Sequence, residues 1–308
     1  MPGFISRFVS APDALRLHAR DYQQADGGTT GGLTVVCLPG LARTSADFHV
    51  LATALLESGV AARVLVIDYR GRGLSARDPN PDRYDLPIES ADLLAVLAAL
   101  EIGAAVFVGT SRGGLHTLML GAVRPTILQG VVLNDIGPVI EPRGLARIRG
   151  YIGKLPEPKS WPDAIDLLKH LASAHFTALE EQDWETFART TFEERDGRFV
   201  PLYDPALMHN LAKLDLDAVP VLWPQFEGLR HVPVLVVRGE NSDLLSAATV
   251  TEMTKRHPDC AAVTVPGQGH APLLIDTPTT RRICQFVERC GFNLHSTAAA
   301  QRGLSLLL

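Results

Sequence analysis

Short apolar runs alternate with segments of helical periodicity along most of this chain. Runs of Val, Ile, Leu and Ala predict buried strands over residues 34–38, 63–68, 104–108, 130–134, 232–237 and 261–265. Helices are predicted over residues 46–58, 88–100, 114–123, 247–257 and 279–290. Continuous apolar strands separated by helices are typical of a parallel sheet covered on both faces. With two amphipathic strands near residues 4–9 and 15–20, the sequence predicts an α/β fold with a mostly parallel, eight-stranded twisted sheet flanked by helices.

The alternation is interrupted by one long insertion. Residues 138–227 contain no strong strand run, and helices are predicted there over residues 163–174 and 180–190. An insertion of this length far exceeds an ordinary connection between elements. Two further segments lack a core pattern: a glycine-rich loop at residues 27–32, and the C-terminal tail, residues 293–308, which is expected to be poorly ordered from residue 296.

Charge and cysteine usage exclude several classes of protein. The net charge of −5 gives no basic surface for nucleic acid or acidic membranes, so neither is an expected partner. The four scattered cysteines form no C-x-x-C pair, which argues against a disulfide framework or a zinc site and favours a reducing compartment. No signal peptide and no uncharged apolar stretch of membrane-spanning length is recognised, so a cytoplasmic location is expected. The oligomeric state stays open, with a homodimer among the alternatives.

A G-x-S-x-G motif occupies the point where a predicted strand meets a predicted helix. Gly109-Thr110-Ser111-Arg112-Gly113 follows the apolar run 104–108 and precedes the helix that opens near residue 114. The pentapeptide alone has little specificity, but strand, sharp turn and helix form the context that a nucleophile elbow requires. The motif therefore makes Ser111 the candidate nucleophile.

A serine nucleophile needs a base and an acid that orients the base. His270, on the Gly-rich loop after the last predicted strand, is the candidate base. Asp243, after the penultimate strand, is the preferred acid, because the order Ser111, Asp243, His270 is the order that a nucleophile-elbow hydrolase uses. Asp135, directly after the run 130–134, is the rival acid. If it is not the catalytic acid, Asp135 is expected to form an ion pair with Arg112.

An acyl-transfer site also needs donors for the developing oxyanion. One candidate is the backbone N–H of Arg112, next to the nucleophile. The other is the backbone N–H of Leu41 in the loop Leu38-Pro39-Gly40-Leu41-Ala42. The Arg112 side chain is a further candidate, either for binding a substrate carboxylate through its planar fork or for stabilising the hinge of the inserted region.

Taken in order, these motifs resemble the α/β-hydrolase fold superfamily over about residues 1–290. The resemblance rests on Pro39-Gly40-Leu41, Asp68-Tyr69-Arg70-Gly71-Arg72-Gly73-Leu74-Ser75, the elbow, Asp243 and Gly269-His270. It implies an α/β-hydrolase core of residues 1–137 and 228–292 with a helical cap of residues 138–227 over the active site. It also implies a scaffold role for the Arg70–Gly73 turn. Pro39 departs from the family pattern, since many relatives carry histidine before the glycine.

The predicted constellation favours two-step hydrolysis of a small-molecule carboxylic ester through an acyl-Ser111 intermediate. A serine at this position argues against the dehalogenases and epoxide hydrolases of the fold, which place aspartate there. No metal-binding or phosphate-binding motif occurs, and no cofactor or metal is expected. Two alternatives stay open: a C–C bond hydrolase of ring-cleavage diketones with the same triad, and a non-catalytic ligand-binding receptor of the same fold.

Substrate choice is expected to depend on aromatic side chains of the insertion. Two or three of six are expected to face the ligand, with Trp161 and Trp223 as the substrate-binding candidates; the six are Trp161, Phe176, Trp184, Phe187, Trp223 and Phe226.

Overall fold

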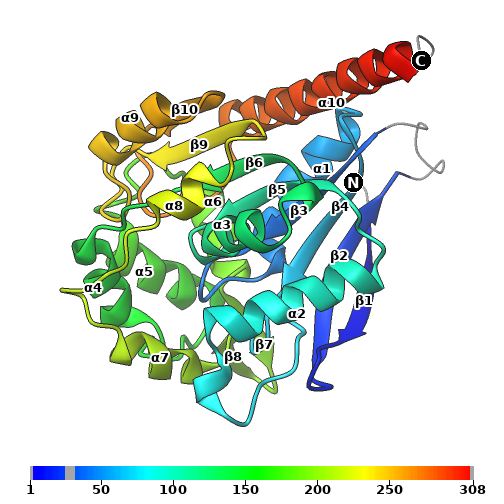
Figure 1. Ribbon diagram of the computed structural model, residues 1–308. Helices are drawn as coiled ribbons and strands as arrows, with labels where there is room; N and C mark the ends of the chain where they lie inside the picture. Colours follow the sequence, from blue (N-terminus) through cyan, green and yellow to red (C-terminus); the bar gives the residue numbers. More distant parts are fainter. Residues whose placement is uncertain (1–2, 25–31, 306–308) are drawn as a thin grey trace.

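The computed structural model describes residues 3–24 and 32–305, with side chains up to residue 292. An eight-stranded sheet runs through the molecule in the order β1-β2-β4-β3-β5-β6-β9-β10 (Figure 1). β1 and β2 pair with each other, and β2 with β4, in antiparallel fashion. All other neighbours in this sheet are parallel. The predicted mostly parallel α/β sheet is confirmed, while the predicted glycine-rich loop lies almost entirely outside the described residues.

The apolar runs of the sequence coincide with the strands of this sheet. Its strands are β1 (Phe4–Ser10), β2 (Arg16–Gln23), β3 (Leu33–Leu38), β4 (Ala61–Asp68), β5 (Ala105–Thr110), β6 (Leu128–Asn134), β9 (Val234–Gly239) and β10 (Cys260–Val265). The helices of this part of the fold are α1 (His49–Glu57), α2 (Leu86–Ala99), α3 (Arg112–Val123), α9 (Ala247–Arg256) and α10 (Thr277–Ser305). Short 3-10 helices are η1 (Ser45–Phe48), η2 (Pro81–Arg83) and η3 (Pro125–Ile127).

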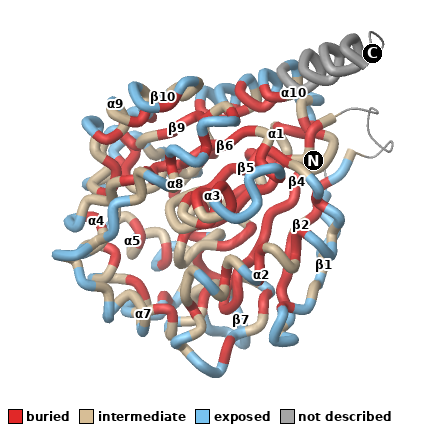
Figure 2. Tube along the Cα trace, in the orientation of Figure 1, coloured by how far each residue is buried: buried red, intermediate tan, exposed pale blue. Residues whose placement is uncertain are grey.

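Two hydrophobic cores cover the two faces of the sheet because successive side chains of a strand point in opposite directions. In β9, Val234 and Val236 belong to the core shared with α2, α3 and α9. Leu235 and Val237, which alternate with these two residues along the strand, belong to the core shared with α1 and α10. Figure 2 shows the central strands buried and β1 partly exposed at the edge of the sheet. Burial on both faces explains why the central strands have continuous apolar runs.

The insertion between β6 and β9 forms a layer of its own beside the sheet (Figure 1). Its elements are α4 (Pro142–Tyr151), α5 (Trp161–Ala172), α6 (Glu181–Arg189), β7 (Phe192–Arg195), β8 (Arg198–Pro201), η4 (Pro205–Leu207), α7 (Met208–Lys213) and α8 (Trp223–Glu227). We call residues 138–227 the cap. A small apolar cluster around Leu168, Phe176 and Trp184 holds α5, α6 and β7 together.

The hairpin β7–β8 corrects the expectation of an insertion without strands. Asp196 and Gly197 join the two strands, and both have positive φ, 52° and 74°. A two-residue turn of this kind favours Asp-Gly, because both central residues need positive φ. The Asp-Gly pair was therefore the signal in the sequence, but its flanking strands are only four residues long each.

The last helix is longer than the sequence pattern predicts. α10 runs from Thr277 to Ser305, whereas the apolar periodicity ends near residue 290. Helical backbone therefore continues through most of the tail that was expected to lack order, and residues 306–308 lie outside the described part. None of the helices in the described ranges combines the length and apolar character needed to cross a membrane.

Candidate active site

Neighbouring parallel strands bring two of the candidate residues to one edge of the sheet. Thr110 at the end of β5 pairs with Asn134 at the end of β6. Ser111 and Asp135 are the next residues along each strand, so they leave the sheet side by side. The carboxyl ends of parallel strands are where open α/β sheets bind their ligands.

The backbone at Ser111 explains why the motif needs its two outer glycines. Ser111 has a φ of +51° and lies at the N-terminus of α3, a sharp turn that holds the hydroxyl away from the sheet. A Cβ on Gly109 would lie 2.5 Å from the backbone nitrogen of Gly114, and one on Gly113 would collide with the carbonyl of Leu38. Both positions therefore exclude side chains.

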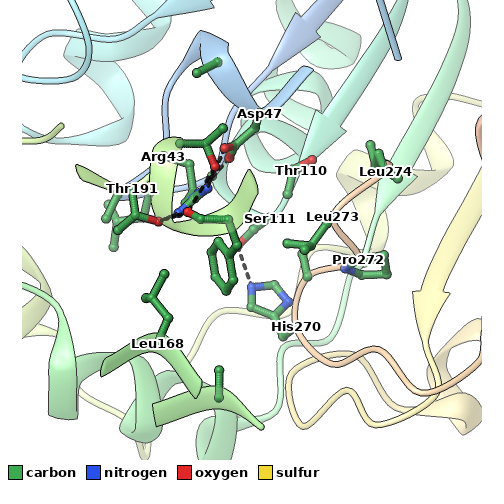
Figure 3. A pocket seen from close by; sticks show the side chains of 18 of the residues that line it. Arg43, Asp47, Thr110, Ser111, Leu168, Thr191, His270, Pro272, Leu273 and Leu274 are labelled. Atoms are coloured by element: carbon green, nitrogen blue, oxygen red, sulfur yellow. Dashed lines mark hydrogen bonds and ion pairs between the residues drawn. The ribbon is translucent and has the colours of Figure 1, made fainter. Parts of the chain in front are cut away.

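His270 bridges the serine and a carboxylate. Its Nε2 lies 2.9 Å from Ser111 Oγ, the contact drawn in Figure 3, and its Nδ1 lies 2.8 Å from Asp135 Oδ2. An ionised carboxylate can only accept, so Nδ1 carries the hydrogen and donates to Asp135. The lone pair of Nε2 is then directed at the serine hydroxyl, which donates to it. This is the tautomer that a general base requires.

The Asp135 carboxylate is fully buried and held by several donors. Oδ1 accepts from the backbone N–H of Gly239 at 2.8 Å, and Oδ2 accepts from Ser242 Oγ at 2.6 Å as well as from His270. Hydrogen bonds of this kind compensate a carboxylate for its lost water. They also fix the orientation of the oxygen that faces the imidazole.

Asp243, the acid preferred from the sequence, does not contact His270 in this arrangement. Its carboxylate accepts from Arg147 Nε at 2.6 Å and from Arg147 Nη2 at 2.8 Å. Asp243 lies four residues beyond the end of β9, whereas Asp135 follows β6 immediately. The expected Asp243–His270 pairing is therefore wrong, and the rival Asp135 takes that place. Arg147 comes from α4 in the cap, so the sequence alone gave no sign of this ion pair.

The two backbone donors predicted for the oxyanion flank Ser111. A Cβ on Gly40 would lie 3.8 Å from Ser111 Cβ, which places the loop with Leu41 against the nucleophile. Leu41 lines the same cavity as Ser111. Within the described part of the chain, the backbone N–H groups of Leu41 and Arg112 have no recorded hydrogen-bond acceptor. Both are therefore available to a substrate oxygen.

The buried carboxylate of Glu89, in α2, pairs with two arginines. One of them, Arg72, contacts the loop of Leu41, and the other, Arg112, directly follows Ser111. The carboxylate accepts from Arg72 Nη1 and from Arg112 Nε, each at 2.5 Å. Arg72 Nε in turn donates to the carbonyl of Leu41 at 2.8 Å. Although burial opposes ionisation, the charges of Arg112 and Arg72 hold the pKa of Glu89 well below its usual value. Arg72, expected to be a scaffold residue, thus anchors the oxyanion loop.

The Arg112 side chain corrects two expectations. Its guanidinium is occupied by Glu89 and the carbonyl of Tyr84, so it forms no ion pair with Asp135. It is also not among the side chains that line the cavity, which leaves it unsuited to binding a substrate carboxylate.

A cavity of about 380 Å³ opens at Ser111 and His270 beneath the cap. This volume falls within the range of small-molecule sites. Most of the wall comes from the cap and the loop after His270, including Ile148, Tyr151, Ile152, Leu155, Leu168, Leu171, Phe176, Phe187, Leu273 and Leu274. The wall is therefore largely apolar.

The cap aromatics divide between this cavity and the packing of the cap. Phe176 and Phe187 line the cavity, whereas Trp161 and Trp223 do not. Trp161 packs edge-on against Phe199, and Trp223 lies beneath the guanidinium of Arg256. Neither of the two residues predicted to bind substrate therefore lines this cavity. Aromatic spacing in the sequence could not separate the inner from the outer surface of the cap.

Arg43 is a site residue that the sequence gave no reason to select. It lines the cavity two positions after Leu41 and forms a two-point ion pair with Asp47, at 2.7 and 2.5 Å. It also donates to the hydroxyls of Thr190 and Thr191 in the cap at 2.7 and 2.5 Å. Figure 3 shows this side chain directed at Asp47 and Thr191. Its partners in the cap, Thr190 and Thr191, are 147 and 148 residues away in the sequence, beyond the reach of any local pattern.

Comparison with known proteins agrees with this geometry. The model of the Alpha/beta hydrolase family matches residues 35–281. The chain belongs to this family. No group of three or more His, Cys, Asp or Glu side chains suited to a metal ion occurs among the residues described.

Several hydrolases resemble the chain over most of its length. A 3-hydroxybutyrate-oligomer hydrolase of Cupriavidus necator is 31% identical over 87% of this chain and 92% of its own. A 2-(acetamidomethylene)succinate hydrolase of Mesorhizobium japonicum is 28% identical over 75% of this chain and 79% of its own. The crystal structure of an alpha/beta hydrolase from Novosphingobium aromaticivorans has a TM-score of 0.85 and 36% identity, covering 94% of this chain and 99% of that one.

Proposed function

We propose that this alpha/beta hydrolase is a serine esterase with the triad Ser111, His270 and Asp135. The observation that carries the proposal is the imidazole of His270 between Ser111 Oγ at 2.9 Å and Asp135 Oδ2 at 2.8 Å. A serine hydroxyl is a weak nucleophile until such a base removes its proton. The match to hydrolases along most of the chain supports the same reaction class.

In the proposed mechanism, His270 takes the Ser111 proton as Oγ attacks the ester carbonyl. The backbone N–H groups of Leu41 and Arg112 donate to the oxyanion that forms. The imidazolium, stabilised by Asp135, then protonates the departing alcohol and leaves an acyl-Ser111 ester. Water enters, His270 removes its proton, and collapse of the second intermediate releases the acid and restores the serine.

The apolar wall and moderate volume of the cavity favour short and medium acyl or aryl esters. A complete hydrogen-bonded Ser–His–Asp arrangement also argues against the alternative of a non-catalytic receptor, which has no need of an activated serine. The C–C hydrolase alternative uses the same three groups, so substrate panels have to distinguish it.

The proposal is tested by labelling and by pre-steady-state kinetics. The protein should react with a fluorophosphonate probe and release a burst of p-nitrophenol from p-nitrophenyl butyrate, and Ser111→Ala should abolish both. Ring-cleavage diketones are assayed in parallel. Turnover of diketones without turnover of any ester would overturn the esterase proposal, as would a probe that labels Ser111→Ala as strongly as the parent protein.

A further inference from the structure

Arg147 lines the cavity with a guanidinium of which one edge pairs with Asp243. The side chain lines the cavity and is 24% exposed. Its Nε and Nη2 donate to the two oxygens of Asp243. A guanidinium has five N–H groups in a planar fork, so this pairing leaves the outer edge, formed by Nη1 and the second hydrogen of Nη2. Within the described chain, no carboxylate other than Asp243 pairs with Arg147.

Of the two neighbours of Arg147, Tyr151 adds a hydroxyl that can donate to an anion, while Asp243 holds the guanidinium in place. Tyr151, one helical turn further along α4, interacts with Arg147 through its phenol and also lines the cavity. Asp243 remains ionised because, against the cost of burial, hydrogen bonds from Arg147 hold its pKa below the usual value. Arg147 lines the same cavity as Ser111 and His270, so the Arg147–Asp243 pair lies at the wall of the pocket that holds the proposed base.

The other two arginines of the cavity wall, Arg43 and Arg20, are held differently. Arg43 makes four donor contacts, with Asp47, Thr190 and Thr191. Arg20 stacks on the ring of Phe4 at the edge strand, and its buried Nε has no hydrogen-bond partner among the described residues. The cavity wall carries three arginines, Arg20, Arg43 and Arg147, and one aspartate, Asp47. When Asp243, the partner of Arg147, is also counted, the net charge of these side chains is +1.

We propose that the outer edge of Arg147, assisted by the Tyr151 hydroxyl, binds a free carboxylate of the substrate. The preferred substrates are then esters that carry such a group, either monoesters of dicarboxylic acids or esters of hydroxy acids. This inference rests on the proposed esterase function and narrows its substrate class. The planar fork matches the two carboxylate oxygens, a geometry that a lysine cannot reproduce.

The test compares mono-p-nitrophenyl glutarate with its methyl ester, methyl p-nitrophenyl glutarate, which has the same chain without the charge. The parent protein should favour the free acid in kcat/KM after subtraction of spontaneous hydrolysis. The ratio of the two kcat/KM values should fall by about tenfold or more in Arg147→Gln, since a charge-assisted hydrogen bond is worth about that factor. Arg147→Lys should fall between the two. Arg143→Gln, an exposed position one turn earlier on α4, is the matched control and should keep the parental ratio.

Binding of glutarate alone, measured by titration calorimetry, gives a readout that does not need turnover. The Kd of glutarate should rise about tenfold or more in Arg147→Gln and in the double variant Arg147→Gln/Asp243→Asn. The double variant is included because the single substitution leaves the Asp243 carboxylate without its partner. Equal ratios and equal glutarate affinities in parent and Arg147 variants would overturn the inference while leaving the esterase proposal intact. Failure of the parent to hydrolyse these two esters and p-nitrophenyl butyrate would refute the esterase proposal, and the anion site would then be tested by glutarate binding alone. A parent protein that does not bind glutarate would refute that site.

Discussion

At the scale of single residues, the triad depends on which carboxylate faces the imidazole. Two aspartates follow strands at the same edge of the sheet, but they have different partners. Asp135 accepts from His270, while Asp243 is neutralised by Arg147. Because Asp243 is held against Arg147 of the cap, its carboxylate accepts no hydrogen bond from His270 in this structure. In the structure, Asp135 therefore holds the imidazole of His270, whereas Asp243 binds Arg147 of the cap.

This difference predicts unequal effects of removing each charge. Asp135→Asn should lower kcat for p-nitrophenyl butyrate by about 10⁴-fold, because an amide favours the wrong tautomer of the imidazole. Asp243→Asn should lower it by less than about tenfold, since His270 keeps its partner. Steady-state kinetics on both variants, with circular dichroism to verify folding, checks the prediction. A larger loss in Asp243→Asn than in Asp135→Asn would reverse the assignment.

The contact between Ser111 and His270 was predictable because the positions of both residues depend on local features: a glycine-flanked turn after one strand and a glycine-rich loop after another. The carboxylate that pairs with His270 was not predictable in this way. Both Asp135 and Asp243 follow strands at the same edge of the sheet, and their different partners, His270 for Asp135 and Arg147 for Asp243, depend on tertiary structure. The same limit applies to Arg112, whose partner Glu89 is brought to it by the packing of α2 and α3.

At the scale of elements, one side chain ties the oxyanion loop to the cap. Arg43 follows Leu41 by two residues and reaches Thr190 and Thr191, between α6 and β7. Its guanidinium also lies 4.8 Å from the ring centre of Phe187. Because these contacts cross the cavity wall, they couple the position of the cap to the loop that carries an oxyanion donor.

Arg43→Met should therefore weaken both stability and substrate binding. The loss of charged hydrogen bonds at a partly buried site should reduce the free energy of unfolding by about 1–3 kcal/mol, and KM for p-nitrophenyl butyrate should rise. Arg195→Met serves as the control, because its ion pair with Glu193 is exposed on the hairpin and should contribute less than about 1 kcal/mol. Thermal unfolding and limited proteolysis of the cap provide the measurements. Indistinguishable behaviour of the two variants would exclude a coupling role for Arg43.

Helices and strands of the sheet were predictable from periodicity, whereas the interior of the cap was not. The strands β7 and β8 pair only with each other, so they lack the long apolar runs that identify buried strands. Trp161 and Trp223 are large aromatic side chains of the kind that often contact ligands, yet they pack against Phe199 and Arg256, respectively. Which side of a small helical layer faces the cavity depends on how the whole layer sits on the sheet.

At the scale of the whole molecule, Glu89 joins three segments that are distant in the sequence. It holds Arg72 from the loop after β4 and Arg112 from the start of α3, and its own helix is α2. All three side chains are buried or nearly so. Ion pairs removed from water are costly to break, because the remaining charges lose their compensation. The network therefore links the stability of the fold to the positions of Leu41 and Arg112, the proposed oxyanion donors.

The same network makes stability depend on pH. Arg112 and Arg72 outweigh the effect of burial and hold the folded-state pKa of Glu89 below its usual value of 4.5. The stabilisation from Glu89 is then fully present above pH 4.5 and is lost as the pH falls toward the lower folded-state pKa, because the unfolded chain binds the proton first. Urea unfolding followed by circular dichroism should show this decline between neutral pH and pH 3. Glu89→Gln should be about 3–5 kcal/mol less stable at neutral pH, with a shallower decline. The control is Glu181→Gln, at an exposed ion pair with Lys169, and it should show the same dependence of unfolding free energy on pH as the parent. If the free energy of Glu89→Gln fell with pH in parallel with that of the parent, the role of the Glu89 carboxylate would be refuted.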